Sequence, residues 1–349
     1  MSQRVTLQTL ADRLGVSRTT VSNAWSRPDQ LSTEVRERIL ALADELGYPG
    51  PDPAARGLRR GRADAIGLLL TETLEYAFGD PHAHELLRGV AAAIEEADIG
   101  LLVVPLPPQR LVGDALRSAV IDGCLVYSMP EDHPALDVLV RRGIPLVTID
   151  GPRLPGVPFV GIDDRGASRE LAELVVSYGH RHVLVLSIRT IDDLYDGPID
   201  RERLSRSVYL NSRERIAGTF EATDAAGVPR DGIVLHEVSR NHRSAAQEVV
   251  ARALAADRPP TAIIALSDEL AAGALDAATA AGRVPGGDIT IVGFDDQESA
   301  AHLNLTTVRQ SAYDKGYRAA AQLVGGGPSG DIVLPHELVR RGSVGPVPS

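Results

Sequence analysis

The sequence predicts a small all-helical unit at the N-terminus, followed by a large α/β domain made of two parallel-sheet subdomains. Residues 5–48 contain three apolar patterns of helical spacing, separated by glycine and proline. From residue 65 onward, short apolar runs alternate with longer helical patterns, which is typical of parallel sheets with helices on both faces. A basic stretch rich in glycine and proline, residues 49–62, lies between the two regions.

The first helical pattern runs from Leu7 to Leu14 and has its apolar residues on one face. Thr6 stands at its N-cap position, where a hydroxyl accepts a first-turn N–H, and a glycine follows its end. Ser17 caps a second pattern, SRTTVSNAW, and Ser32 caps a third. Two short helices joined by a turn that contains glycine are typical of a helix-turn-helix.

The second helix carries hydrogen-bonding side chains on its outward face, while Val21 and Ala24 point inward. Such a face suits the major groove of DNA; a helical bundle used for protein contacts is the alternative. We predict a DNA-binding surface that includes the caps Thr6 and Ser17, the base-reading residues Arg18, Thr19 and Asn23, and the phosphate-contacting residues Thr20 and Ser22.

The basic stretch 49–62, PGPDPAARGLRRGR, has the composition of a linker, but its centre can form two helical turns that start at a proline. Leu58 has no apolar partner there and lies among arginines. An apolar wedge flanked by cations suits insertion into a minor groove, with Arg56 and Arg59 on phosphates. The alternative is a solvated linker that is basic.

After residue 62 the pattern predicts nine strands and eight helices. The strands are 65–70, 100–105, 123–127, 146–149, 159–162, 182–186, 233–238, 262–265 and 289–294, and the helices are 82–97, 111–120, 135–142, 166–178, 213–226, 242–256, 268–280 and 313–324. Nine strands are many for one sheet, so we predict two halves that meet at a cleft lined by the carboxyl ends of strands. We interpret the polar stretch 188–212 as an exposed insertion, with a lid over the cleft as the alternative.

Motifs along the whole chain carry a family resemblance. VTLQTLADRLGVSRTTVS and ARGLRRG resemble the headpiece and hinge helix of the lactose-repressor (LacI/GalR) family of bacterial transcriptional regulators, and GIPLVTIDG, VGIDDRGA, YGHRHV, RERIAG, PTAIIALSDELAAGAL, ITIVGFDD and LTTVRQ resemble its effector domain. The resemblance implies a headpiece at 1–48, a hinge at 49–62 and a periplasmic-binding-protein-like domain for effector binding and dimerisation at 63–349. That domain would have discontinuous halves, an N-subdomain at about 64–163 plus 313–327 and a C-subdomain at about 164–312 plus 328–345.

Three acidic residues directly follow predicted strands: Asp150, Asp163 and Asp295. A carboxylate at such a strand end projects into the cleft and accepts hydroxyl groups from a sugar-like ligand; a cap on the next helix is the alternative. By resemblance, Asp163, Asp295 and Arg215 fall on positions that contact effector. The resemblance extends more loosely to His82, Arg243, Ser267 and Glu269. Aromatic residues make up 4% of the chain, and no ring for stacking on a sugar stands out.

Charge and composition narrow the class of protein. The net charge is −11, yet residues 1–62 hold ten of the 36 basic and seven of the 47 acidic residues, so an acidic body carries a basic arm that suits DNA. Lys315 is the only lysine, which we interpret as compositional bias. Cys124 is the only cysteine, which excludes an internal disulfide. The sequence has neither a signal-peptide pattern nor an apolar run of membrane-spanning length, so we predict a cytoplasmic protein without membrane contact.

These features predict a ligand-responsive, sequence-specific DNA-binding transcriptional regulator, a repressor released by a small polar effector such as a sugar. A corepressor-dependent regulator with a nucleoside or purine-like effector stays open, and so, more remotely, does a solute-binding protein. Since no activated nucleophile, metal cluster or phosphate loop stands out, we expect no enzymatic activity, no cofactor and no metal. We expect a homodimer on pseudo-palindromic operator DNA, because one headpiece buries too little surface for tight binding.

Overall fold

The computed structural model describes residues 5–50, 62–107, 113–326 and 329–348. The chain forms two compact units, Met1–Asp64 and Ala65–Ser349. The predicted hinge helix, with Arg56, Leu58 and Arg59, lies outside the described residues. Within the described ranges, no helix is both long enough and apolar enough to cross a membrane.

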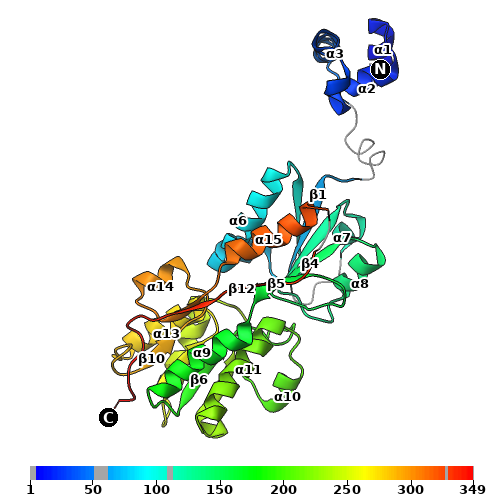
Figure 1. Cartoon of the computed structure of the whole chain (residues 1–349). Coiled ribbons are helices and arrows are strands. Elements are labelled where there is room, and N and C mark those ends of the chain that lie inside the picture. The colour runs from blue at the N-terminus through cyan, green and yellow to red at the C-terminus, as the bar shows by residue number, and fades with distance from the viewer. Residues whose placement is uncertain (1–4, 51–61, 108–112, 327–328, 349) are drawn as a thin grey trace. The chain divides into compact units, whose positions relative to one another are not determined.

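The N-terminal unit contains the three predicted helices, α1 (Leu7–Leu14), α2 (Arg18–Ser26) and α3 (Thr33–Glu45), with the short 3-10 helix η1 (Pro28–Gln30) before α3 (Figure 1). The predicted caps are confirmed, because the hydroxyls of Thr6, Ser17 and Ser32 each accept a first-turn backbone N–H. The apolar faces of all three helices meet in one small core. The rings of Trp25 and Tyr48 pack edge to face beside it, with their centroids 5.8 Å apart.

The first half of the large unit is built on a six-stranded parallel sheet with the order β12-β5-β4-β3-β1-β2. Its strands are β1 (Ala65–Leu70), β2 (Gly100–Pro105), β3 (Gly123–Tyr127), β4 (Leu146–Ile149), β5 (Phe159–Ile162) and β12 (Ile332–Leu334). Neighbouring residues such as Leu68 and Leu69 enter cores on opposite faces of the sheet. One face is covered by α5 (Leu74–Gly79), α6 (Pro81–Glu96) and α15 (Ala312–Val324), and the other by α7 (Asp114–Ser118) and α8 (Pro134–Arg141).

The second half has a five-stranded sheet with the order β10-β9-β6-β8-β7, parallel except for β7. Its strands are β6 (Val183–Ser187), β7 (Gly197–Pro198), β8 (Ile233–Glu237), β9 (Ala262–Ala265) and β10 (Thr290–Val292). Helices α9 (Asp164–Ser177) and α11 (Leu210–Ala225) pack on one face, and α12 (Arg243–Leu254) and α13 (Asp268–Ala280) on the other. The remaining elements are α10 (Arg201–Ser205), η2 (Arg230–Gly232), α14 (Glu298–His302) and the antiparallel pair β11 (Thr307–Arg309) and β13 (Glu337–Val339).

The structure confirms two parallel-sheet halves, and β1 to β5 and β9 have the predicted bounds. One boundary needs correction. The resemblance assigned residues 328–345 to the second half, but β12 pairs with β5 in the first sheet, with Ile332 opposite Val160. A run of three apolar residues is too short for its periodicity to show which sheet it joins. The predicted helix 111–120 is also shorter, since α7 begins at Asp114 and ends at Ser118.

Helices α6 and α15 lie side by side, with their backbones almost in contact (Figure 1). A Cβ atom on Gly89 of α6 would lie 2.0 Å from the carbonyl oxygen of Tyr313, and one on Gly316 of α15 would lie 2.2 Å from the carbonyl oxygen of Leu86. Because both obstacles are backbone atoms, a side chain at either glycine forces the two helices apart.

We therefore predict that Gly89→Ala lowers the free energy of unfolding of the large unit by about 1–3 kcal/mol, the usual cost of overpacking. Urea unfolding followed by far-UV circular dichroism measures this, because the only tryptophan lies in the N-terminal unit. The matched control is Gly79→Ala, where a Cβ meets nothing within 4 Å. Equal unfolding midpoints for both variants would contradict the close packing.

Candidate functional site

The predicted DNA contacts lie at the N-terminus of α1 and along α2. Thr6 and Ser17 are the N-caps of these helices. On α2 itself, the predicted contact residues Arg18, Thr19, Thr20, Ser22 and Asn23 are all exposed or half-buried. This surface therefore presents one guanidinium, several hydroxyls and one amide, which are the groups that hydrogen-bond base edges and phosphates.

Local hydrogen bonds fix some of these side chains more firmly than others. The hydroxyl oxygens of Ser17 and Thr20 lie 2.8 Å apart, so both are held at the first turn of α2. The side-chain amide of Asn23 donates to Gln30 of η1 over a long distance, 3.4 Å. A hydrogen bond of that length is weak, so Asn23 is free to turn toward a base edge.

The large unit contains a cavity of about 110 Å³ between its two halves. The first half contributes Leu70, Thr71, Glu72, Tyr76, Ala77, Asp80, His82, Ala83, Tyr127, Ser128 and Asp150, and the second half contributes Ile188, Arg189, Tyr209, Asn211, Arg215, Asn241, Ser267 and Asp295. Many of these residues directly follow a strand, so the cavity lies where the sequence predicted the cleft. We call it the interlobe pocket.

The structure brings together five of the residues predicted to bind an effector, since the interlobe pocket is lined by His82, Asp150, Arg215, Ser267 and Asp295. Three of them are Asp150, Ser267 and Asp295, which come just after strands β4, β9 and β10. These three residues therefore lie in a cleft at the carboxyl ends of parallel strands, as the sequence predicted.

Three predicted residues do not line the pocket. Asp163 is the N-cap of α9 and accepts the backbone N–H of Gly166 at 2.9 Å, so the helix-cap alternative describes it. Arg243 forms an ion pair at the surface with Asp276, with 2.5 Å between Nε and Oδ2. Glu269 lies in the first turn of α13, two positions after the pocket serine, and residues two apart on a helix face different directions.

The stretch 188–212, interpreted from sequence as an exposed insertion, supplies much of one pocket wall. Arg189, Tyr209 and Asn211 are buried and line the interlobe pocket. Only the middle of the stretch is exposed, for example Leu194. The interpretation is therefore wrong for both ends of the stretch. The predicted helix 213–226 also begins too late, because α11 begins at Leu210. The late start left Asn211 outside the predicted helix.

Three tyrosines provide the aromatic surface that the sequence analysis did not identify. Tyr76 lies on α5, Tyr127 ends β3, and Tyr209 is the N-cap of α11; all three line the interlobe pocket. The sequence could have identified Tyr127, because it is the last residue of a predicted strand. The same kind of position identified Asp150, which directly follows a strand. The sequence could not have identified Tyr76, because α5 has only six residues and no clear periodicity.

Polar contacts between pocket residues join the two halves. Arg189 of the second half forms an ion pair with Glu72 of the first. The amide of Asn241 donates to Asp80 Oδ2 at 3.2 Å. Since the residues that line the pocket also hold the halves together, a ligand bound there contacts both halves and the bonds between them.

Arg215 is already occupied by protein atoms. Its Nε donates to Asp164 Oδ1 at 2.7 Å, and its Nη1 donates to the carbonyl oxygen of Leu266 at 2.8 Å. The guanidinium also lies over the ring of Phe294, 3.8 Å from its centroid. By resemblance, Arg215 was expected to contact the effector; in the structure its Nε and Nη1 groups hydrogen-bond protein atoms that support the pocket wall.

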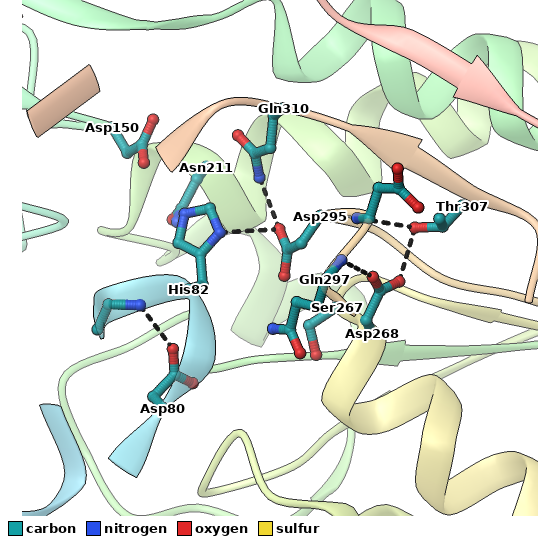
Figure 2. A network of polar contacts seen from close by, with 12 residues as sticks. Asp80, His82, Asp150, Asn211, Ser267, Asp268, Asp295, Gln297, Thr307 and Gln310 are labelled. Carbon is teal, nitrogen blue, oxygen red and sulfur yellow. Dashed lines mark hydrogen bonds and ion pairs between the residues drawn. The ribbon is translucent and has the colours of Figure 1, made fainter. Parts of the chain in front are cut away.

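Figure 2 shows a polar network around Asp295. Its Oδ1 accepts a hydrogen bond from Gln310 Nε2 at 2.6 Å and lies 3.5 Å from His82 Nδ1. Burial raises the pKa of Asp295 to about 7 and lowers the pKa of His82 to about 4. Burial and the nearby Asp295 also raise the pKa of Asp268 to about 7. At neutral pH His82 is uncharged, so its contact with Asp295 is not an ion pair.

Three pocket residues have an unusual backbone. Ser128, Asp150 and Asp295 have positive φ angles of 43°, 56° and 124°. Residues other than glycine rarely adopt this region, and strain of this kind concentrates at functional sites. Here it turns the chain directly after strands, where the side chains reach the cavity.

Known proteins share both parts of this arrangement. Residues 6–50 match the family of bacterial regulatory proteins of the lacI type, and residues 172–344 match the periplasmic binding protein-like domain. The chain is 43% identical over 351 residues to the HTH-type transcriptional regulator Rv3575c of Mycobacterium tuberculosis, covering 99% of this chain and 98% of that protein.

Solved structures are similar over nearly the whole chain. The crystal structure of a LacI-family transcriptional regulator from Corynebacterium glutamicum has a TM-score of 0.75 and 34% identity, covering 98% of this chain and 100% of that one. The complex of the regulator CelR with cellobiose has a TM-score of 0.66 and 25% identity, covering 97% of this chain and 100% of that one.

The raised pKa of Asp295 predicts how stability depends on pH. Below about pH 4 this carboxyl is protonated in the folded and unfolded states alike. Between about pH 4 and 7 the unfolded chain loses the proton while the folded chain keeps it, so this group lowers stability as the pH rises. We predict that Asp295→Asn reduces the decrease in the free energy of unfolding over this pH range.

The measurement is the urea midpoint of the wild type and the variant across this pH range. The control is Asp276→Asn at the surface, where the hydrogen bond from Arg243 lowers the pKa of Asp276; it should leave the slope above about pH 5 unchanged. Parallel curves for the wild type and Asp295→Asn would show that Asp295 ionises normally.

Proposed function

The chain belongs to the lacI family of bacterial regulatory proteins, and on that premise we propose that it is a transcriptional repressor released from its operator by a small polar effector. The observation that carries this proposal is that one chain combines a helix-turn-helix, whose second helix has a polar outward face, with a polar pocket enclosed between two α/β halves. We also propose a cytoplasmic location, where operator DNA lies, and no catalytic role.

For DNA binding, the side chains of α2 support major-groove reading. Arginine pairs best with guanine and asparagine with adenine, so we assign base contacts to Arg18 and Asn23 and phosphate contacts to Thr20 and Ser22. One headpiece buries too little surface for tight specific binding, so we propose a homodimer that reads a pseudo-palindromic operator. Leu58 would insert into the minor groove, with Arg56 and Arg59 on phosphates.

For effector binding, the interlobe pocket supports a sugar-like molecule. Carboxylates, amides and hydroxyls supply hydrogen-bonding groups, and Tyr76, Tyr127 and Tyr209 supply rings, a combination that suits a hydroxyl-rich ligand. CelR, which resembles this chain throughout, binds cellobiose. A ligand that contacts both halves stabilises one arrangement of the halves over another. In a dimer, this shift changes the affinity for DNA.

We predict that Asn23→Ala relaxes specificity at one base pair in each half-site, at a cost of about 1–3 kcal/mol. Fluorescence anisotropy with the DNA upstream of the gene, and with single base-pair changes in it, measures this. Ser22→Ala is the matched variant and should weaken binding to all sequences alike. A uniform loss for Asn23→Ala as well would remove Asn23 from the base-reading set.

A thermal-shift screen of neutral sugars and nucleosides identifies the effector, because a true ligand raises the melting temperature. We predict that Asn211→Ala weakens its binding about tenfold, since a buried hydrogen-bonding partner is lost. Arg243→Ala, outside the pocket, should bind the effector normally, and both variants should bind operator normally without it. The reverse order of effects would place the effector elsewhere, and operator binding that requires the ligand would identify a corepressor.

A further inference from the structure

The single lysine of this chain lies behind the wall of the interlobe pocket. Of 36 basic residues, only Lys315 is not arginine. Compositional bias explains the arginines, but it does not explain why the exception is also the one wholly buried cation among the described residues, with an exposed fraction of 0%. An ammonium is a compact donor and a guanidinium is a broad planar one, so this position has a specific requirement.

Lys315 contacts two residues that connect the halves of the large unit. Its Nζ lies 2.6 Å from Asp150 Oδ1, at the end of β4 in the first half. It also donates to Gln310 Oε1, just after β11 in the second half. Asp150 itself lines the pocket and is 3% exposed, so Lys315 neutralises a carboxylate that would otherwise be buried without a partner.

The ammonium also fixes which way Gln310 points. A side-chain amide has one accepting and one donating end, and an ammonium can only donate, so the oxygen of Gln310 must face Lys315. The nitrogen then faces Asp295, and it donates to Oδ1 at 2.6 Å (Figure 2). Lys315 therefore determines that Asp295 receives a donor from the protein and that Asp295 acts there as an acceptor.

The remaining charges leave no free cation for a ligand. Among the described residues that line the pocket, Arg189 is paired with Glu72 and Arg215 with Asp164. His82 is uncharged at neutral pH, because burial and the nearby Lys315 lower its pKa to about 4. Among the described residues, Gln310 and His82 both contact Asp295 at Oδ1, which leaves Oδ2 for the cavity.

We propose that Lys315 is a positioning residue that sets the polarity of the interlobe pocket, so that Asp150 and Asp295 present acceptors and the effector must bring hydroxyl or amino donors without a phosphate or carboxylate group. This inference rests on the proposed effector role of the pocket. The pocket rejects an effector that carries a phosphate or carboxylate, because that group would face Asp150 and Asp295 as a like charge at a buried site.

One arm of the test needs no ligand. In full-length protein grown with isotope-labelled lysine, NMR shows one side-chain signal, because there is one lysine. We expect a protonated ammonium that exchanges slowly with water, which Gln310→Leu shifts and the surface variant Arg153→Met does not. A fast-exchanging signal like that of free lysine, or one unaffected by Gln310→Leu, overturns the positioning role.

The other arm measures selectivity by calorimetry at pH 8, where Asp295 is ionised because its pKa is about 7. The ligands are neutral sugars, polyols and nucleosides, each paired with its phosphate or carboxylate derivative. We expect the wild type to bind at least one neutral or amino compound, and its anionic derivative at least about a hundredfold more weakly. Lys315→Met should weaken binding of the neutral compound at least about tenfold and should reduce the ratio between the affinities for the neutral compound and its anionic derivative. If Lys315→Met does not fold, Gln310→Glu replaces the donor facing Asp295 by an acceptor. It should also weaken binding of the neutral compound at least about tenfold, and because it adds a negative charge it should widen the ratio of the two affinities.

The two proposals fail in different ways. Tight binding of an anionic compound by the wild type overturns the assigned polarity and leaves the proposed regulator intact. An unchanged ratio in both variants also overturns it. If no compound binds at all, the proposed sugar-like effector is contradicted, and the lysine signal alone then decides whether Lys315 positions Gln310.

Discussion

The large unit depends on the pairing of charges that are buried where its two halves meet. A charge buried without a partner costs several kcal/mol. Each buried cation must therefore lie next to a carboxylate that another part of the chain provides. The parallel sheets make this possible, because the carboxyl ends of their strands lie at one edge. Among the described residues, three such pairs are Arg189 with Glu72, Arg215 with Asp164, and Lys315 with Asp150.

This pairing is consistent with the proposed effector role of the pocket. One pair, Arg189 with Glu72, joins the two halves directly, and Lys315 joins them through Gln310. Among the described residues, the pocket carboxylates Asp80 and Asp295 form no ion pair with an arginine or lysine, and both accept hydrogen bonds from side-chain amides. A ligand that supplies further donors acts on the same groups that hold the halves together, so its binding and the arrangement of the halves are one equilibrium.

Most of the fold followed from the sequence, and part of the site did. The apolar runs defined β1 to β5 correctly because each is bounded by turn residues, and Asp150 and Asp295 were found because they follow such runs. Asp163 follows one too, but a strand end that leads straight into a helix makes a cap instead. Arg189 was not found, because its place depends on tertiary contacts such as the one with Glu72. Periodicity contains no information on such contacts.

In the proposed function, a small molecule bound between the two halves controls operator binding. Hydrogen–deuterium exchange of the full-length protein on operator DNA, with and without a neutral compound that binds it, tests this directly. We expect the operator to be released while exchange slows at pocket segments of both halves, residues 70–83 and 127–128 in one and 188–190 and 209–211 in the other. Release of the operator with slower exchange in one half only, or at the surface groove of residues 153–159, would contradict the account.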